Sequence, residues 1–251
     1  MRLHTERDGV GPPLVLVHGF TQTRRCWGPV ADDLALDHTV VRVDAPGHGR
    51  SAEVTAGLPD GALLIADEGR EATYLGYSMG GRYLLHLALA RPTVVRGLVL
   101  LGATAGIDDP DERSDRARAD EATAERIHEL GLAGFLQTWV DQPMFAGIPP
   151  ERQQLPERME NTVEGLAGSL RNAGTGAQEP SWDELHRLDM PVLVLAGDRD
   201  VKFSELGRRM AAAIGDSATF ATVPGAGHAA HLERPDAFLA ILRPWLADRG
   251  L

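Results

Sequence analysis

The chain has 251 residues, of which 43% are hydrophobic and 24% are charged, a balance that is ordinary for a soluble globular protein. Its net charge of −11 argues against nucleic acids and anionic membranes as partners. The first residues lack the apolar stretch of a signal peptide, and no run approaches the ~20 apolar residues of a membrane span. We therefore expect a cytoplasmic protein.

Length and cysteine content narrow the class further. The length suits one domain, or one domain with an inserted cap. The single cysteine, Cys26, excludes an internal disulfide framework and fits a reducing compartment. We expect this residue to be a small buried side chain and not a reactive thiol, because free cysteines are commonly buried.

Short apolar runs in the sequence predict strands that are buried on both faces of a parallel sheet. In chain order these runs are 14–17, 39–43, 72–76, 97–101, 192–195 and 218–223. Helical patterns occur between them, at 27–34, 62–69, 79–90, 203–214 and 235–246. Alternation of strands and helices predicts an α/β fold, with a mostly parallel sheet that is covered by helices on both faces.

The stretch from 105 to 182 breaks this alternation. Residues 110–130, 132–140 and 157–171 have helical patterns, and four prolines interrupt the region. Roughly 75 residues are too many for one crossover connection. We therefore expect an inserted helical cap, with ordinary crossover helices as the alternative. The expected organisation is a first core part at 1–104, the cap at 105–182 and a second core part at 183–251.

The segment Gly76-Tyr77-Ser78-Met79-Gly80 has the form G-x-S-x-G and lies between a predicted strand and a predicted helix. In that setting a sharp turn exposes the serine hydroxyl at the edge of the sheet. The flanking glycines allow the backbone to pack tightly around the turn. We therefore expect Ser78 to be catalytic and not a plain turn residue.

Two further candidates follow later strands. Asp198 and Asp200 come after the run 192–195, and His228 lies in a loop after the run 218–223. A serine hydroxyl becomes reactive when a histidine accepts its proton and a carboxylate orients that histidine. We expect His228 to be the base and favour Asp200 as the acid, with Asp198 as a turn cap.

The remaining histidines carry less functional signal. We expect His48 and His231 to be structural, although His231 remains a candidate for the pocket wall. The nine histidines show no metal-ligand spacing, and the glycines form no phosphate-binding loop. We therefore expect neither a metal nor a cofactor.

Taken together, these residues resemble the α/β-hydrolase fold superfamily over nearly the whole chain. The segment His18-Gly19-Phe20 is similar to the oxyanion loop of that family, and residues 44–51 (DAPGHGRS) are similar to its D-x-x-G-x-G-x-S turn. The resemblance implies an oxyanion hole made by the backbone N–H groups of Phe20 and Met79. Two fixed donors of this kind stabilise a developing oxyanion by ~3–4 kcal/mol each.

Four segments resemble a narrower family, the 2-succinyl-6-hydroxy-2,4-cyclohexadiene-1-carboxylate synthases of menaquinone biosynthesis (MenH enzymes). The segments are 76–82 (GYSMGGR), 139–145 (WVDQPMF), 197–203 (GDRDVKF) and 226–231 (AGHAAH). Enzymes of this family eliminate pyruvate from a substrate with three carboxylates, leave a cyclohexadiene, and need no metal or cofactor. The resemblance implies a carbon–oxygen lyase that acts on an anionic small molecule.

The same resemblance implies a set of substrate-binding residues. Arg82 lies one helical turn after the serine and on the same face, where a guanidinium can bind a carboxylate with two hydrogen bonds. Arg116 and Arg158 match the other substrate arginines of the family. Tyr77 and Trp139 are candidates for the pocket wall.

Several other functions stay open at this point. A carboxylesterase or lactonase would use the same three residues on a neutral ester, and a carbon–carbon bond hydrolase would use them on ring-cleavage products. A ligand receptor on the same fold is a remote alternative. A haloalkane dehalogenase is disfavoured because its nucleophile at this turn is an aspartate. The net charge of −11 opposes an anionic ligand at long range, so the lyase hypothesis requires a local cluster of arginines. The sequence favours neither a monomer nor a homo-oligomer.

Overall fold

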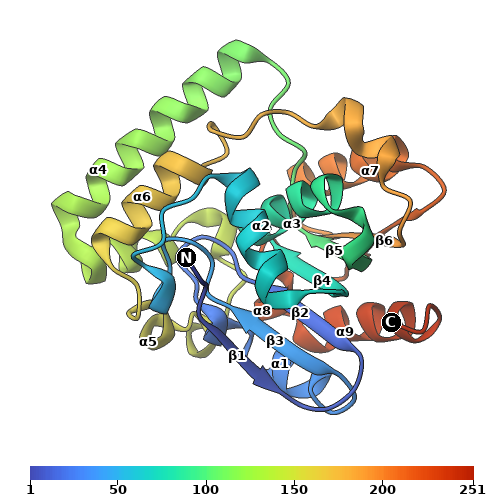
Figure 1. Ribbon diagram of the computed structural model, residues 1–251. Coiled ribbons are helices and arrows are strands. Elements are labelled where there is room, and N and C mark those ends of the chain that lie inside the picture. The colour runs from blue at the N-terminus through green and yellow to red at the C-terminus, as the bar shows by residue number, and fades with distance from the viewer.

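The computed structural model describes residues 1–251, and its seven strands form one sheet (Figure 1). The strand order is β1-β3-β2-β4-β5-β6-β7; β1 runs antiparallel to β3, and all other neighbours are parallel. The predicted mostly parallel sheet is therefore confirmed. The strands are β1 (Thr5–Asp8), β2 (Pro13–Val17), β3 (Thr39–Val43), β4 (Ala72–Tyr77), β5 (Val95–Leu101), β6 (Val192–Gly197) and β7 (Ala218–Val223).

Helices cover both faces of this sheet (Figure 1). Within β2, Val15 and Val17 pack into one core, whereas Leu14 and Leu16 pack into the other. Burial on both sides explains why the strand runs are apolar at every position. The first core lies under α2 (Leu58–Gly69), α3 (Met79–Ala90) and α7 (Val201–Ile214), and the second under α1 (Gly28–Leu34), α8 (Ala230–Glu233) and α9 (Pro235–Ala247).

The first strand, β1, has no counterpart among the predicted apolar runs. Its four residues are polar and only partly covered, because β1 lies at the edge of the sheet. An edge strand of this length carries little hydrophobic pattern to detect.

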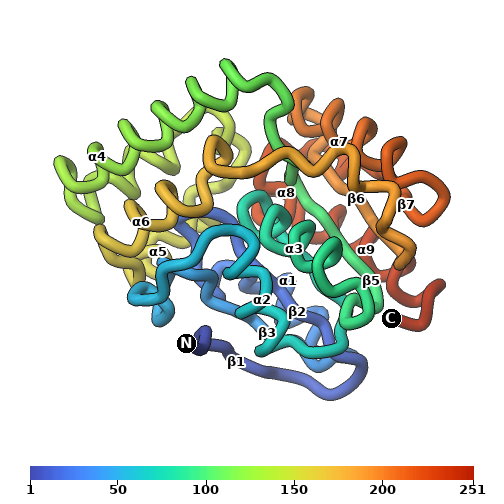
Figure 2. Tube along the Cα trace, turned by 45° about the horizontal axis from the view of Figure 1, so that its top comes forward, coloured from blue at the N-terminus to red at the C-terminus, as the bar shows by residue number.

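The connection between β5 and β6 contains helices that lie outside the two covering layers (Figures 1 and 2). These helices are α4 (Pro110–Val140), α5 (Leu155–Arg158) and α6 (Val163–Ala173). Short 3₁₀ turns complete the chain: η1 (Arg24–Trp27), η2 (Gly49–Ser51), η3 (Pro92–Val94), η4 (Pro143–Phe145), η5 (Pro150–Arg152) and η6 (Trp182–Arg187). Helices α4 and α6 share a small apolar core of their own, made by Ala124, Ile127, Phe135, Leu136, Leu166, Ala167 and Leu170.

Two helix predictions in this region have different outcomes. Gly131 adopts φ 64° and ψ 171° inside α4, which divides α4 into two helical pieces, as expected for 110–130 and 132–140. The single helix expected at 157–171 is wrong. The chain forms α5 and then starts α6 afresh, because the Thr162 side chain accepts a hydrogen bond from the Gly165 N–H and acts as an N-cap.

A buried arginine ties the inserted helices to the sheet. The Arg24 guanidinium contacts Glu6 at 2.7 Å, Asp44 at 2.9 Å and Glu160 at 2.8 Å. Glu160 lies between α5 and α6, whereas Asp44 directly follows β3. Because Arg24 is almost fully buried, its charge needs these partners, and the loss of one would leave an uncompensated charge inside the protein.

Three of the buried histidines are almost completely shielded from solvent. His18, His48 and His231 are each at most 1% exposed, and burial lowers the pKa of these residues to about 4, 3 and 3 respectively, from the ordinary 6.5. His231 lies against the rings of Trp27 and Tyr77, at centroid distances of 4.8 Å and 4.4 Å. Neither of its ring nitrogens has a hydrogen-bond partner. The folded protein therefore keeps these histidines neutral.

We predict that the free energy of unfolding falls as the pH is lowered from 7.5 to 5. Below pH 6.5 these histidines are protonated in the unfolded chain, whereas in the folded chain they stay neutral. This difference lowers the free energy of unfolding by roughly 2 kcal/mol per buried histidine at pH 5. His231→Phe keeps a ring between the two aromatic neighbours and should make unfolding less pH-dependent. His186→Gln, at an exposed position, is the control. Denaturant unfolding at both pH values measures the effect, and equal pH dependence in wild type and His231→Phe would contradict it.

Candidate active site

Ser78 lies in a sharp turn between β4 and α3, with φ 51° and ψ −109°. This conformation is strained for a residue with a side chain, so the surrounding structure must hold it. A Cβ atom added to Gly80 would lie 2.0 Å from the Val17 carbonyl oxygen, and one added to Gly76 would lie 2.5 Å from the backbone of Gly80. Glycine at both positions thus lets α3 begin directly against β2 and β4.

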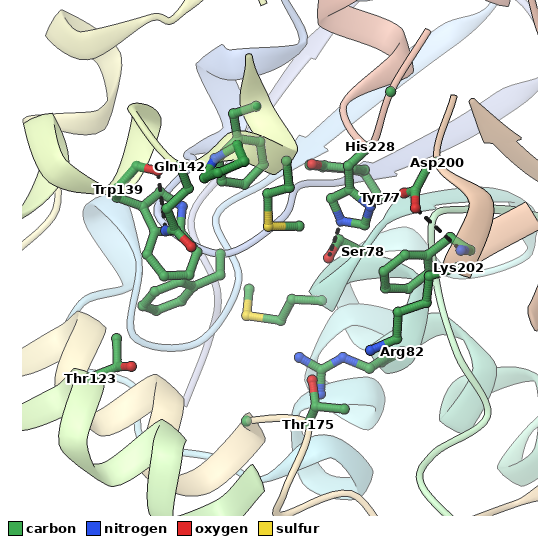
Figure 3. Close-up of a pocket in the computed structure, with 18 of the residues that line it drawn as sticks. Tyr77, Ser78, Arg82, Thr123, Trp139, Gln142, Thr175, Asp200, Lys202 and His228 are labelled. Atoms are coloured by element: carbon green, nitrogen blue, oxygen red, sulfur yellow. Dashed lines mark hydrogen bonds and ion pairs between the residues drawn. The ribbon is translucent and has the colours of Figure 1, made fainter. Parts of the chain in front are cut away.

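The serine, a histidine and an aspartate form a connected row. His228 Nε2 lies 3.3 Å from Ser78 Oγ (Figure 3), and His228 Nδ1 lies 2.7 Å from Asp200 Oδ2. The Nδ1–H tautomer donates to the carboxylate and leaves Nε2 free to accept a proton from the serine. The three residues follow β4, β6 and β7, whose carboxyl ends meet at one edge of the sheet.

The two candidate acids have different partners. Asp198 is exposed, and its Oδ1 accepts a hydrogen bond from the Gly225 N–H at 2.9 Å. Asp200 contacts the histidine, and its other oxygen accepts from the Phe203 N–H at the start of α7. The geometry therefore pairs Asp200, and not Asp198, with His228.

The backbone around Phe20 and Met79 offers two donors beside the serine. The Phe20 N–H has no hydrogen-bond partner in the protein. Met79 is the first residue of α3, where a backbone N–H has no acceptor within the helix. Both residues line the same cavity, at the ends of the paired strands β2 and β4. The loop that follows Phe20 is held in place by Asn161, whose side-chain amide donates to the Thr21 carbonyl at 2.8 Å.

A cavity of about 930 Å³ opens in front of Ser78 (Figure 3). Loops at the carboxyl ends of the strands form one wall of the cavity, and the inserted helices form the opposite wall. Tyr77 and Trp139 line this cavity, as the sequence predicts for a pocket wall. Aromatic rings form much of its apolar side: Phe20, Trp139, Phe145 and Phe203.

Arg82 is a buried cation in this cavity. It is 7% exposed, and its Nη1 donates to the Ala173 carbonyl at 2.7 Å, but no carboxylate lies within ion-pair distance. Burial lowers the pKa of the Arg82 guanidinium to about 10, so the group remains charged at neutral pH. A buried charge with a single carbonyl partner still has donors available for an anionic ligand.

The other two expected arginines are placed differently. Arg116 lines the cavity, but its Nε already contacts Asp120 at 2.7 Å. Arg158 does not line the cavity. Its Nε donates to the Gln153 carbonyl at 2.8 Å and its Nη1 contacts Thr21 Oγ1, so it holds the loop that follows Phe20. Direct contact between Arg158 and a ligand in this cavity is therefore not supported.

His48, His231 and Cys26 do not line the cavity. His48 donates from Nδ1 to the Pro46 carbonyl at 3.0 Å, and His231 packs in the core. Cys26 is buried, and that burial raises the pKa of its thiol. No group of three or more potential metal ligands occurs in the structure. None of the helices has an apolar stretch long enough to span a lipid bilayer.

Two residues that line the cavity were not singled out from the sequence. Glu233 is 2% exposed and accepts hydrogen bonds from the Gly227 N–H at 2.7 Å and the Ala229 N–H at 3.1 Å, so it holds the backbone on both sides of His228. Lys202 is the only lysine of the chain. Because Lys202 is the only lysine, it could have been singled out from the sequence. The residues around Glu233 show no pattern that would have indicated its role.

Comparisons with known proteins agree with this architecture. The chain is 33% identical to the 2-succinyl-6-hydroxy-2,4-cyclohexadiene-1-carboxylate synthase of Yersinia pseudotuberculosis, over 95% of this chain and 88% of that protein. Its structure is similar to that of MenH from S. aureus, with a TM-score of 0.90 and 26% identity over 100% and 99% of the two chains. A malate-bound esterase from Thermogutta terrifontis gives a TM-score of 0.85 with 26% identity, over 99% and 94%.

The match to a family model covers most of the chain, from residue 14 to residue 241. This range includes every strand from β4 to β7 and all three residues of the Ser78–His228–Asp200 row. The chain is a member of the alpha/beta hydrolase family.

Proposed function

We propose that this protein is a MenH-type carbon–oxygen lyase, which eliminates pyruvate from a polyanionic cyclohexene intermediate of menaquinone biosynthesis. Relatives that carry the synthase name match over nearly the full length of both chains, which supports this activity. The observation that carries the proposal is the presence of an unpaired buried guanidinium, Arg82, in the same cavity as the serine–histidine pair. An arginine so placed suits a substrate with carboxylates better than a neutral one.

In this proposal the three connected residues carry the proton transfer. His228 takes the proton of Ser78, and the activated serine oxygen removes a proton from a ring carbon of the substrate. Asp200 stabilises the imidazolium and fixes the tautomer of the histidine through its 2.7 Å contact. The 3.3 Å separation between the serine and the histidine is short enough for this transfer once a substrate is bound.

The electron pair released from the ring carbon then completes the elimination. It forms the new ring double bond, and the carbon–oxygen bond to the enolpyruvyl group breaks. The leaving enolpyruvate takes up a proton and becomes pyruvate. Charge that develops on a substrate oxygen during proton removal is stabilised by the backbone N–H groups of Phe20 and Met79, which need no reorganisation to do so.

The inserted helices have a role of their own in this proposal. We treat residues 105–182 as a cap that closes the cavity over the core parts 1–104 and 183–251. The wall formed by Trp139 and Phe145 excludes water from the reacting groups. Arg82 joins core to cap, because it extends from α3 to the Ala173 carbonyl at the end of α6.

A serine esterase is the second candidate. Many enzymes with the α/β-hydrolase fold use the same set of three residues to hydrolyse esters. The similarity to the Thermogutta terrifontis esterase and the aromatic side of the cavity favour this alternative. In such an enzyme Ser78 would form an acyl intermediate, and Arg82 would be dispensable for a neutral substrate.

We predict that Asp200→Asn lowers kcat far more than Asp198→Asn, by about 10³- to 10⁴-fold for the first change. An amide cannot stabilise an imidazolium and favours the wrong tautomer of His228. Asp198 accepts a hydrogen bond from the Gly225 N–H and does not contact His228. Asp198→Asn is therefore the matched control, because it makes the same chemical change two residues away. Steady-state kinetics on one substrate decides the question, and a larger loss for Asp198→Asn would move the acid to that position.

We also predict that Arg82→Ala lowers kcat/KM on the polyanionic intermediate by about 10- to 10³-fold, because a charge-assisted pair with a substrate carboxylate is lost. Hydrolysis of a small neutral p-nitrophenyl ester should change little. Arg82→Lys should rescue the first activity only in part, since an ammonium lacks the planar pair of donors.

The neutral ester serves as the control for a structural effect of Arg82. Loss of its hydrogen bond to Ala173 would disturb the cap for both substrates alike. Equal losses on the anionic and the neutral substrate would therefore assign Arg82 to cap anchoring and would remove the main support for the lyase.

A further inference from the structure

Lys202 occupies a position that helix stability does not explain. It is the second residue of α7, and cations near the N-terminus of a helix oppose the helix dipole. The first turn of α7 contains no acidic residue to pair with it. No ion pair or hydrogen bond involves its ammonium group, although the chain has 36 acidic residues. The only lysine of the chain is thus an exposed residue at the cavity, without a partner in the protein.

Lys202 and Arg82 line the same cavity from different helices. The side chain of Lys202 extends from α7 and that of Arg82 from α3, and Figure 3 shows both in the cavity that also contains Ser78. Two cations that share a cavity repel each other unless negative charge lies between them. The effect grows as the cavity is closed from water, because the local dielectric constant falls.

None of the acidic residues of the cavity forms an ion pair with Arg82 or Lys202, and each has another partner. Asp120 contacts Arg116 and the Gly176 N–H, Asp200 contacts His228, and Glu233 accepts two backbone N–H groups. Three cations of the cavity lining, Arg82, Lys202 and the exposed Arg199, therefore have no carboxylate partner, within a protein whose net charge is −11. A ligand with two negative groups would compensate Arg82 and Lys202.

We infer that Lys202 binds a second carboxylate of the substrate, so that this residue determines the preference of the cavity for a dicarboxylate over a monocarboxylate. This inference rests on the proposed function and deepens it, because it adds a specificity-determining residue on the triad side of the cavity. One carboxylate pairs with the guanidinium of Arg82 from α3, and the other with the ammonium of Lys202 from α7.

The test measures binding and not turnover. The probes are homophthalate, a benzene ring with two carboxylates, and its monomethyl ester, which has one. Calorimetric titration gives the Kd of each for wild type, Lys202→Met, Lys202→Arg and Arg208→Met. Arg208→Met is the control because it removes one positive charge from the same helix. The Arg208 side chain stacks on Phe220 and does not line the cavity.

We expect wild type to bind homophthalate more tightly than the monoester. Lys202→Met should weaken the binding of homophthalate by about tenfold and should abolish most of the preference over the monoester. Lys202→Arg should retain the preference, since it keeps the charge. Added salt should weaken homophthalate binding more in wild type than in Lys202→Met. Arg208→Met should behave like wild type.

Two results would overturn the inference. One is that wild type binds neither probe or binds both equally; the other is that Lys202→Met and Arg208→Met have the same effect. Failure of the proposed function is a separate result. If the protein released no pyruvate from the menaquinone intermediate but kept a Lys202-dependent preference for the dicarboxylate, the lyase would be rejected and the dicarboxylate site retained.

Discussion

The tight turn at Ser78 is the constraint on which the rest of the site depends. Its backbone has φ 51°, and it is held there because α3 begins in direct contact with β2 and β4. A side chain at Gly80 would collide with the Val17 carbonyl and push the helix away from the sheet. The same contact brings Met79 and Arg82, which lies one turn further along α3, to the cavity that Phe20 also lines. The positions of the proposed nucleophile, oxyanion donor and anion-binding cation on α3 thus follow from one packing arrangement.

Electrostatics supports the proposed preference of the cavity for anions. The protein as a whole is strongly acidic, which repels anions at long range, whereas the cavity lining contains three cations without carboxylate partners, Arg82, Arg199 and Lys202. The buried Arg24 has three carboxylate partners, whereas the buried Arg158 has none and donates to the Gln153 carbonyl and to Thr21 Oγ1 outside the cavity lining. Arg82 differs from both because it lines the cavity and has a single carbonyl partner. A guanidinium without a carboxylate partner, in the same cavity as a serine–histidine pair, supports the proposal of an anionic ligand.

Much of the fold and the centre of the site could be predicted from the sequence, because both depend on local pattern. Buried strands have continuous apolar runs, and Ser78, Asp200 and His228 each lie in a loop that follows one. Long-range side-chain placement has no such local signature. The resemblance to the MenH family implied that Arg158 binds the substrate, whereas in the structure Arg158 contacts Thr21 and does not line the cavity. The division between α5 and α6 was missed because the helical pattern continues across it. The helix N-cap at Thr162 depends on a single side-chain hydrogen bond.

The most direct test of the account is to supply the purified protein with the cyclohexene intermediate of menaquinone biosynthesis and to measure pyruvate release. A panel of neutral p-nitrophenyl esters is measured beside it under the same conditions. The account predicts repeated turnover, one pyruvate for each cyclohexadiene formed, and a higher kcat/KM for the intermediate than for any ester. Rapid ester hydrolysis without pyruvate release from the intermediate would contradict the account and establish an esterase in its place.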